Sequence, residues 1–103
     1  MSNKKLKIKP VHPGVVLMKD FLEPLELSQN KVALSIGVHP RRINEIVHGN
    51  RSVTADTALR LGQYFNVSPE FWMNIQYRYD LESAKEKNFE TIVKEVRPLN
   101  KSK

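Results

Sequence analysis

Residues 28–49 read SQNKVALSIGVHPRRINEIVHG, and this stretch decides the fold. In its first half the apolar residues follow helical spacing and form one face, made of Val32, Ala33 and Ile36. Ser28 is a good N-cap for this helix, because its hydroxyl can accept a hydrogen bond from a free backbone N–H of the first turn. Gly37 marks the end of the helix, since glycine favours the left-handed dihedrals of a helix C-terminus.

A second short helix is predicted directly after this glycine. Pro40 is favoured at the first position of a helix, where its missing N–H is not needed. The helix has an apolar side that would hold it on the core, made of Ile43, Ile46 and Val47. Ala33 is small enough to let the two helices cross closely, and Val38 would fill the core beneath the turn. Two short helices hinged at a glycine, with paired arginines at the start of the second, are the layout of a helix-turn-helix, which places one helix in the major groove of DNA.

Composition excludes several classes of function. The chain has 103 residues, the size of one domain with a modest core, and it contains no cysteine. The lack of cysteine excludes disulfides, thiolate metal sites and thiol catalysis. No apolar run approaches the length of a membrane span, and the N-terminus lacks the apolar core of a signal peptide. We expect a cytoplasmic protein that does not enter a membrane.

The charge of the chain suits a polyanionic partner. There are 17 lysines and arginines against 11 acids, a formal net charge of +6. Residues 1–10 contain four lysines and no acid, and residues 28–51 contain four lysines or arginines against Glu45 alone. Residues 80–103 are nearly balanced. The positive excess therefore lies on a basic N-terminal arm and on the predicted helix-turn-helix.

Two further helices are expected, one before the motif and one after it. Residues 14–22 carry an apolar stripe at helical spacing, and Pro24 should end that helix. Thr54 should cap a helix that runs through Asn66, and Asp56 adds a favourable negative charge to its first turn.

The last helix should be the longest. Ser68 is placed as its N-cap and Pro69 as its first residue, and we expect it to end at about Lys87. The β-branched residues of segment 89–96 favour a short strand, with a helical turn as the alternative. Such a strand would pair with residues 6–9 or with the same segment of a second subunit. The predicted fold class is all-α, with five helices and a possible short C-terminal strand.

Five segments of the chain match the pattern of a known family. They are HPG at 12–14, LEPL at 22–25, INEIVHGNR at 43–51, SPEFWMNIQ at 68–76 and YDL at 79–81. On these segments the chain resembles the lambda-repressor-like helix-turn-helix domain, or XRE class. More narrowly, it resembles the HigA/VapI-type antitoxins of bacterial toxin–antitoxin modules. The resemblance implies a dimeric operator-binding protein that neutralises a small, basic RelE-like ribonuclease toxin and represses its own operon.

The resemblance covers about residues 10–88 and suggests an organisation for the chain. We expect a basic arm at 1–10, a helix-turn-helix domain at 11–88 with the motif itself at 28–48, and a tail at 89–103. A two-fold homodimer would place its two recognition helices about 34 Å apart, one turn of B-DNA, which predicts an inverted-repeat operator in double-stranded DNA.

The start of the second motif helix is expected to read bases. In this fold its first turns meet base edges or flanking phosphates, and the candidates are Pro40, Arg41, Arg42, Asn44 and Glu45. Arg41 and Glu45 are the favoured base readers, because an arginine fork can bond guanine O6 and N7 together and a glutamate can accept from a cytosine amine. Arg42 and Asn44 could contact either bases or the backbone. The alternative for Glu45 is an intrahelical ion pair with Arg41 or Arg42.

Three further residues are candidates for phosphate contacts. Gln29, just inside the first motif helix, matches the family position that bonds a phosphate together with its helix N-terminus. Lys31 and Arg51 would add salt-sensitive contacts to the DNA backbone. The alternative for Arg51 is a solvated loop charge.

The last helix carries candidates for a dimer interface. Trp72 is expected in the core, as large aromatic residues at helical spacing normally are. Yet Trp72, Ile75 and Tyr79 belong to a long helix that one small domain cannot cover all round, so part of this surface is a candidate interface.

No metal, cofactor or catalytic site is predicted. His12, His39 and His48 lack the spacing and the additional ligands of a metal site. His48 lies near a helix C-terminus, where it can interact with free carbonyls. The sequence shows no nucleophile–base pattern and no glycine-rich phosphate loop, so we expect no enzyme.

Two alternative functions compete with the antitoxin. One is a stand-alone repressor without a toxin partner, and the other is an interaction module that no longer reads DNA. The arginine pair 41–42 argues against the interaction module, because a recognition helix that no longer contacts DNA has no use for two arginines at its start. The block at 68–81 favours the antitoxin by resemblance alone.

Overall fold

The structure is a computed structural model that describes residues 9–100. These residues form helices only, in this order: α1 (Pro13–Val16), η2 (Leu17–Leu22), α2 (Glu23–Leu25), α3 (Gln29–Ile36), α4 (Pro40–Val47), α5 (Ala55–Phe65) and α6 (Pro69–Glu95). The first three follow one another without a gap and form one rod, so the described chain has the five predicted helical rods. The all-α prediction is confirmed.

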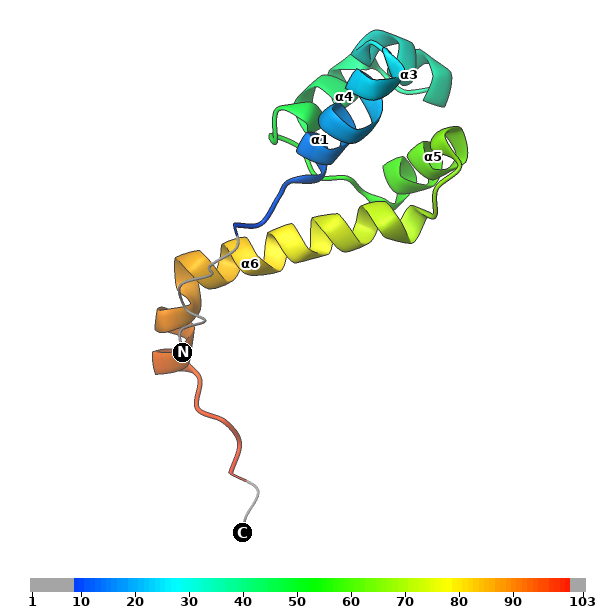
Figure 1. The fold of residues 1–103 in the computed structure, drawn as a ribbon. Coiled ribbons are helices and arrows are strands. Elements are labelled where there is room, and N and C mark those ends of the chain that lie inside the picture. Colours follow the sequence, from blue (N-terminus) through cyan, green and yellow to red (C-terminus); the bar gives the residue numbers. More distant parts are fainter. Residues whose placement is uncertain (1–8, 101–103) are drawn as a thin grey trace.

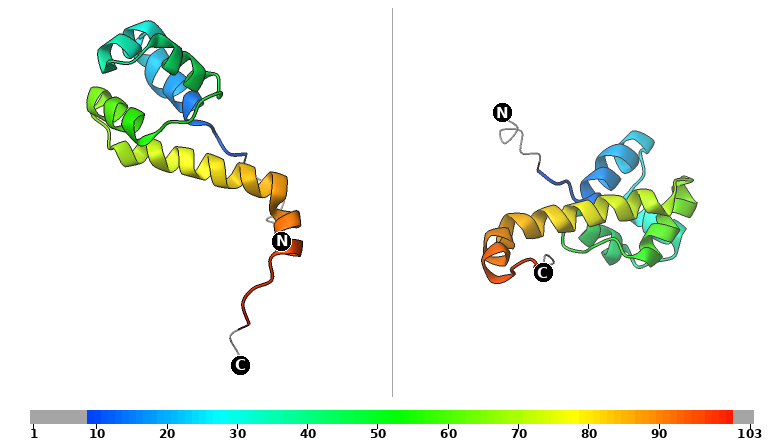
Figure 2. Two further views of the ribbon diagram at one scale, coloured as in Figure 1. Left: turned by 180° about the vertical axis from the view of Figure 1, so that it is seen from behind. Right: turned by 90° about the horizontal axis from the view of Figure 1, so that it is seen from below.

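The other helices lie at the first half of α6, which α5 and the α1 rod contact directly. In Figure 1 the α1 rod, α3 and α4 pack together at one end of the molecule, and α5 lies beside the first half of α6. The second half of α6 extends past the other helices, and its last turns bend away from the axis of the first part. Figure 2 shows the same extension from behind and from below. The principal-axis extents of 58 × 31 × 22 Å reflect this projecting helix.

The core lies where the α1 rod, α3, α4 and α5 meet the start of α6. Its fully or almost fully buried apolar residues are Leu17, Leu22, Val32, Ala33, Ile36, Ile43, Ile46, Val53, Ala58, Leu61 and Trp72. The set includes the predicted inner residues of both motif helices, and Val38 packs against it as expected. The Trp72 ring contacts Phe21 and Phe71, with centroids 5.1 Å away in each case. Among the described residues its indole N–H has no hydrogen-bond partner.

The first rod approaches the second motif helix very closely. A Cβ atom on Gly14 would meet the carbonyl oxygen of Ile46 and lie 2.7 Å from its carbonyl carbon. Glycine is required here by space, because only a residue without Cβ lets the two backbones touch. This contact fixes where α4 lies relative to α1.

The first rod also ends later than predicted. Pro24 does not stop it, because the helix continues through Leu25 and ends at Glu26, which has φ of 55°. The Glu23 N–H bonds to Met18 O, five residues back, in a wider π-helical turn. Pro24 needs no partner for an N–H, so it is accommodated in the turn that follows.

The end of α6 differs most from the prediction. The helix does not end at about Lys87, and the predicted strand over 89–96 is wrong: α6 continues to Glu95, and the Val96 N–H bonds to Ile92 O at 2.8 Å. A lone strand leaves its backbone groups unpaired, whereas a helix satisfies them within the segment. The expected domain boundary at 88/89 falls inside this helix. Most of the N-terminal arm, residues 1–8, lies outside the described residues.

Candidate nucleic-acid interface

The first motif helix has its predicted caps, and the second begins at its predicted residue. The Ser28 hydroxyl accepts from the Lys31 N–H at 3.0 Å, and Gly37 ends α3 with φ of 77°. Pro40 is the first residue of α4. His39 caps this helix through its ring, because Nδ1 accepts from the Arg41 N–H at 3.0 Å. The sequence did not reveal that cap, since histidine is not among the usual N-cap residues.

Arg41 is the free cation of the recognition helix. Its side chain is exposed and has no ion-pair or hydrogen-bond partner within residues 9–100. The guanidinium can therefore approach a ligand without first breaking a contact in the protein. Pro40, before it, is partly buried at the helix start.

A hydrogen bond joins the two motif helices on their outer side. Asn44 Nδ2 on α4 donates to Gln29 Oε1 on α3 at 3.1 Å. A base-reading candidate and a phosphate candidate are thus brought together. At the other end of α4, the ring Nδ1 of His48 lies 2.9 Å from Asn44 O. This carbonyl already accepts the His48 backbone N–H at 3.1 Å, so it is not the free carbonyl that the sequence analysis expected.

Glu45 and Arg51 form an ion pair. Arg51 Nε donates to Glu45 Oε1 at 2.8 Å, although the two residues belong to α4 and to the loop after it. An ion pair with Arg41 or Arg42 was the sequence-based alternative for Glu45, and that partner choice is wrong. Arg51 is likewise not a lone solvated charge. Both side chains remain partly exposed, so the pair is open to exchange with a ligand.

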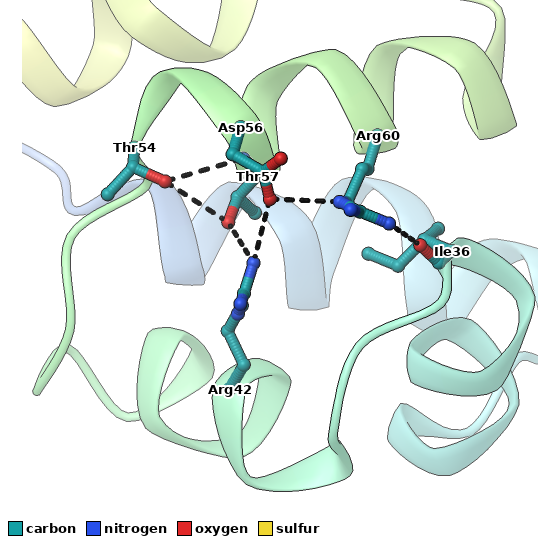
Figure 3. A network of polar contacts seen from close by, with 6 residues as sticks. All are labelled: Ile36, Arg42, Thr54, Asp56, Thr57 and Arg60. Carbon is teal, nitrogen blue, oxygen red and sulfur yellow. Dashed lines mark hydrogen bonds and ion pairs between the residues drawn. The ribbon is translucent and has the colours of Figure 1, made fainter.

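The Arg42 side chain extends from α4 towards α5. Its Nη1 donates to Asp56 Oδ2 at 3.0 Å and to the Thr57 hydroxyl at 3.3 Å. Figure 3 shows this side chain rising from α4 to the first turn of α5. On the other side of Asp56, Arg60 Nε donates to Oδ2 at 2.9 Å. The hydrogen bonds from Arg60 and then from Arg42 lower the pKa of the Asp56 carboxyl below its ordinary value.

A hollow of about 300 Å³ is lined by three residues at the start of α4, His39, Arg41 and Arg42, and by Arg51 from the loop after this helix. Four cationic or ionisable groups around one depression can accept an anion such as a phosphate oxygen. Lys31 is exposed on α3 and has no ion pair within residues 9–100.

The three interface candidates differ in position. Trp72 is fully buried in its own core and is wrong as an interface residue, because none of its surface remains for a partner. Ile75 is partly buried and lines a groove of about 790 Å³ between the α1 rod and α6, with Val11 and Val15 on the opposite side. Tyr79 is also partly buried, edge-on to the His12 ring at 4.9 Å.

His12 caps the first rod. Its Nδ1 accepts from the Gly14 N–H at 2.9 Å, so that nitrogen carries no proton when the cap is formed. Burial lowers the pKa of His12 below its ordinary value, and the Asp80 carboxylate opposes that shift.

Gln76 is a structural residue that sequence reasoning missed. It is almost fully buried on α6, where Oε1 accepts from the Val53 N–H at 2.7 Å and Nε2 donates to Asp80 at 2.9 Å. It ties the loop after the recognition helix to the long helix. The available signal was a lone amide at helical spacing with Trp72, which by itself does not distinguish a buried from an exposed position.

The described part of the chain offers no metal site or membrane span. Within residues 9–100 no three His, Cys, Asp or Glu side chains are grouped closely enough to hold a metal ion. None of the described helices is both long and apolar enough to cross a membrane.

Comparison with known proteins places the chain in a family. A family model described as Helix-turn-helix matches residues 18–72. The chain is 44% identical to virulence-associated protein I of Dichelobacter nodosus over 82 residues, which cover 80% of this chain and 76% of that protein. It is 33% identical to antitoxin HigA-1 of Vibrio cholerae over 96 residues, 93% of this chain and 90% of the relative.

A solved structure gives the same result. The structure of Pseudomonas aeruginosa antitoxin HigA with the higBA promoter matches at a TM-score of 0.85 and 40% identity, covering 88% of this chain and 99% of that one. Both motif helices and their caps lie inside residues 18–72, the range that the family model matches. The chain therefore belongs to the XRE-type helix-turn-helix family, among the relatives of the HigA antitoxins and virulence-associated protein I.

Proposed function

We propose that this protein is the antitoxin of a type II toxin–antitoxin module. It binds an inverted-repeat operator of its own operon as a homodimer, in the cytoplasm, and neutralises a small basic ribonuclease toxin of the RelE-like class. Its action is binding, without catalysis. The observation that carries this proposal is the similarity to HigA antitoxins along nearly the whole chain, including one whose structure contains promoter DNA.

Arg41 is the principal base reader in this proposal. Its guanidinium is exposed at the start of α4 and free of internal partners among the described residues, which favours a bidentate contact with guanine. Glu45 accepts from a cytosine amine once its ion pair with Arg51 opens. The Asn44 side chain is hydrogen-bonded to Gln29, so it contacts only those bases that it can reach while this hydrogen bond is kept.

The remaining contacts are to the DNA backbone. Lys31 and Arg51 are exposed cations that contact phosphates, and Gln29 does so at the N-terminus of α3. Arg51 exchanges its contact with Glu45 for one with a phosphate. These residues contribute affinity and salt sensitivity, and they position Arg41 on the duplex.

The surface of α6 supports a homodimer. The second half of this helix carries exposed apolar side chains: Leu81, Phe89, Ile92 and Val93. The last three are spaced i, i+3 and i+4 and so share one face of the helix, and an exposed apolar face supports an interaction surface. Ile75 and Tyr79 lie on the same helix nearer the core. We expect Ile92→Glu to give monomers in sedimentation equilibrium, while Lys87→Glu on the same helix stays dimeric; a dimeric Ile92→Glu protein would exclude this surface.

Arg41→Ala tests the DNA-binding part of the proposal. The variant should bind the DNA upstream of its own gene more weakly by about 1–3 kcal/mol, or about 5- to 150-fold, and with a relaxed base preference. Arg97→Ala removes the same charge from the exposed tail and should change affinity little. Unchanged affinity and base preference in Arg41→Ala would exclude Arg41 as a base reader.

A growth assay tests the antitoxin part. The small reading frame beside this gene is expressed alone and then together with this protein. Growth arrest that co-expression relieves supports the antitoxin. A harmless neighbour, or an arrest that this protein does not relieve, would instead support a stand-alone repressor.

A further inference from the structure

Asp56 lies between two arginines at the point where the helix-turn-helix meets α5. One of its oxygens accepts from Arg42 on the recognition helix at 3.0 Å and from Arg60 on its own helix at 2.9 Å. Arg60 also donates through Nη1 to Ile36 O, at the end of α3, at 2.8 Å. Figure 3 shows the chain of contacts from Arg42 through Asp56 to Ile36.

The two ion pairs are accessible to solvent. The side chains of Arg42 and Asp56 are 32% and 57% exposed, and that of Arg60 is 43% exposed. Exposed ion pairs are weak and exchange readily with other ligands of the same sign. A DNA phosphate would therefore compete with the Asp56 carboxylate for Arg42.

This competition bears on the general affinity for DNA. Binding to DNA of any sequence depends on how many phosphates the protein neutralises, whereas selection of one site depends on base contacts. A carboxylate that occupies Arg42 therefore removes one phosphate contact and leaves the base contacts of Arg41 unchanged. Binding to DNA of any sequence becomes weaker and less dependent on salt as a result.

Resting on the proposed DNA-binding function, we propose that Asp56 is a positioning residue that limits the general affinity for DNA, because it holds Arg42 away from DNA phosphates. A purely structural role for Asp56, in which it only fastens α5 to the motif, leads to a different outcome. Loosening the motif would weaken DNA binding or leave it unchanged, and it would not add a phosphate contact.

Asp56→Asn separates the two roles. Asparagine has nearly the same size and shape as aspartate, so the fold should persist, as circular dichroism will verify, while the loss of the negative charge removes the electrostatic attraction that holds Arg42. Binding to a labelled 20-base-pair duplex of random sequence is measured by fluorescence anisotropy between 50 and 200 mM salt. One added phosphate contact steepens the slope of log K against log salt by about 0.9, and, with equal affinities at 1 M salt, this slope gives about eightfold tighter binding at 0.1 M salt.

Two controls complete the design. Asp20→Asn makes the same change of charge on the exposed part of η2 and should leave the salt slope as in the wild type. In an Arg42→Met background, Asp56→Asn should lose its effect on the slope, because the released cation is absent. An unchanged slope in Asp56→Asn, an equal effect of Asp20→Asn, or an effect that survives in Arg42→Met would each overturn the proposal. A wild-type protein that binds neither this duplex nor its own upstream DNA would instead overturn the proposed function itself.

Discussion

The contact between Gly14 and α4 leads to a sharp prediction for Gly14→Ala. The added Cβ would lie 2.7 Å from the carbonyl carbon of Ile46 and 3.0 Å from the Cα of Val47, and closer still to the Ile46 oxygen. Ordinary van der Waals contact begins at 3.4 Å, so the carbonyl carbon alone needs about 0.7 Å more room. All three atoms belong to the backbone, and no side-chain rotation can relieve the overlap. The first rod and α4 must therefore move apart.

The expected cost follows from two opposing effects. Overpacking of this kind destabilises a protein by about 1–3 kcal/mol, whereas replacing glycine by alanine inside a helix favours folding by at most about 1 kcal/mol. We expect a net loss of about 1–2 kcal/mol in the free energy of unfolding. For a domain of this size each kcal/mol lowers Tm by about 4–8 °C.

Urea unfolding followed by circular dichroism measures this loss. Val15→Ala is the matched control, because Val15 is the next residue in the same helix, is 45% exposed and should cost less than about 1 kcal/mol. Where Gly14→Ala remains folded, it should also bind DNA more weakly, since α4 is displaced. A Gly14→Ala protein as stable as the wild type, or more stable, would refute the reasoning from backbone contact.

Two further predictions concern buried polar groups. Gln76→Leu should cost about 1–3 kcal/mol in urea unfolding, because the buried Val53 N–H loses its acceptor; Gln63→Leu, at an exposed site, should cost little, and equal costs would contradict this role of Gln76. His12 has a lowered pKa in the fold, so below its ordinary value of 6.5 the unfolded chain binds the proton more readily. Stability should therefore fall as pH drops from 6.5 through the folded pKa, as measured by urea midpoints, and His12→Asn, which can still cap, should flatten this dependence. A wild-type midpoint that does not change over this range would contradict the prediction.

The sequence alone determined the helix-turn-helix. The cap at Ser28, the left-handed Gly37 and the first position of Pro40 are all found where the sequence predicts them. These features depend on contacts within about four residues, which the order of side chains specifies directly. The same short-range rules predicted which faces of both helices are buried, and hence that Arg41 is exposed.

Short-range rules failed where a segment has no neighbours. The β-branched residues of 89–96 suggested a strand, but no other segment of the described chain lies beside them to pair with. Without a partner the segment continues the helix, whose hydrogen bonds are internal.

The tertiary structure alone decided which polar groups pair. The Arg42 guanidinium is paired with Asp56, 14 residues away, and the Val53 N–H with the Gln76 side chain, 23 residues away. Glu45 pairs with Arg51 and not with Arg41 or Arg42 on its own helix, because the loop after α4 folds back beside it. Two arginines adjacent in sequence thus differ: Arg41 has no partner among the described residues, and Arg42 is held by a carboxylate. The physical reason is that an ion pair needs its two groups within about 4 Å, and for residues far apart in sequence only the packing of helices brings them that close.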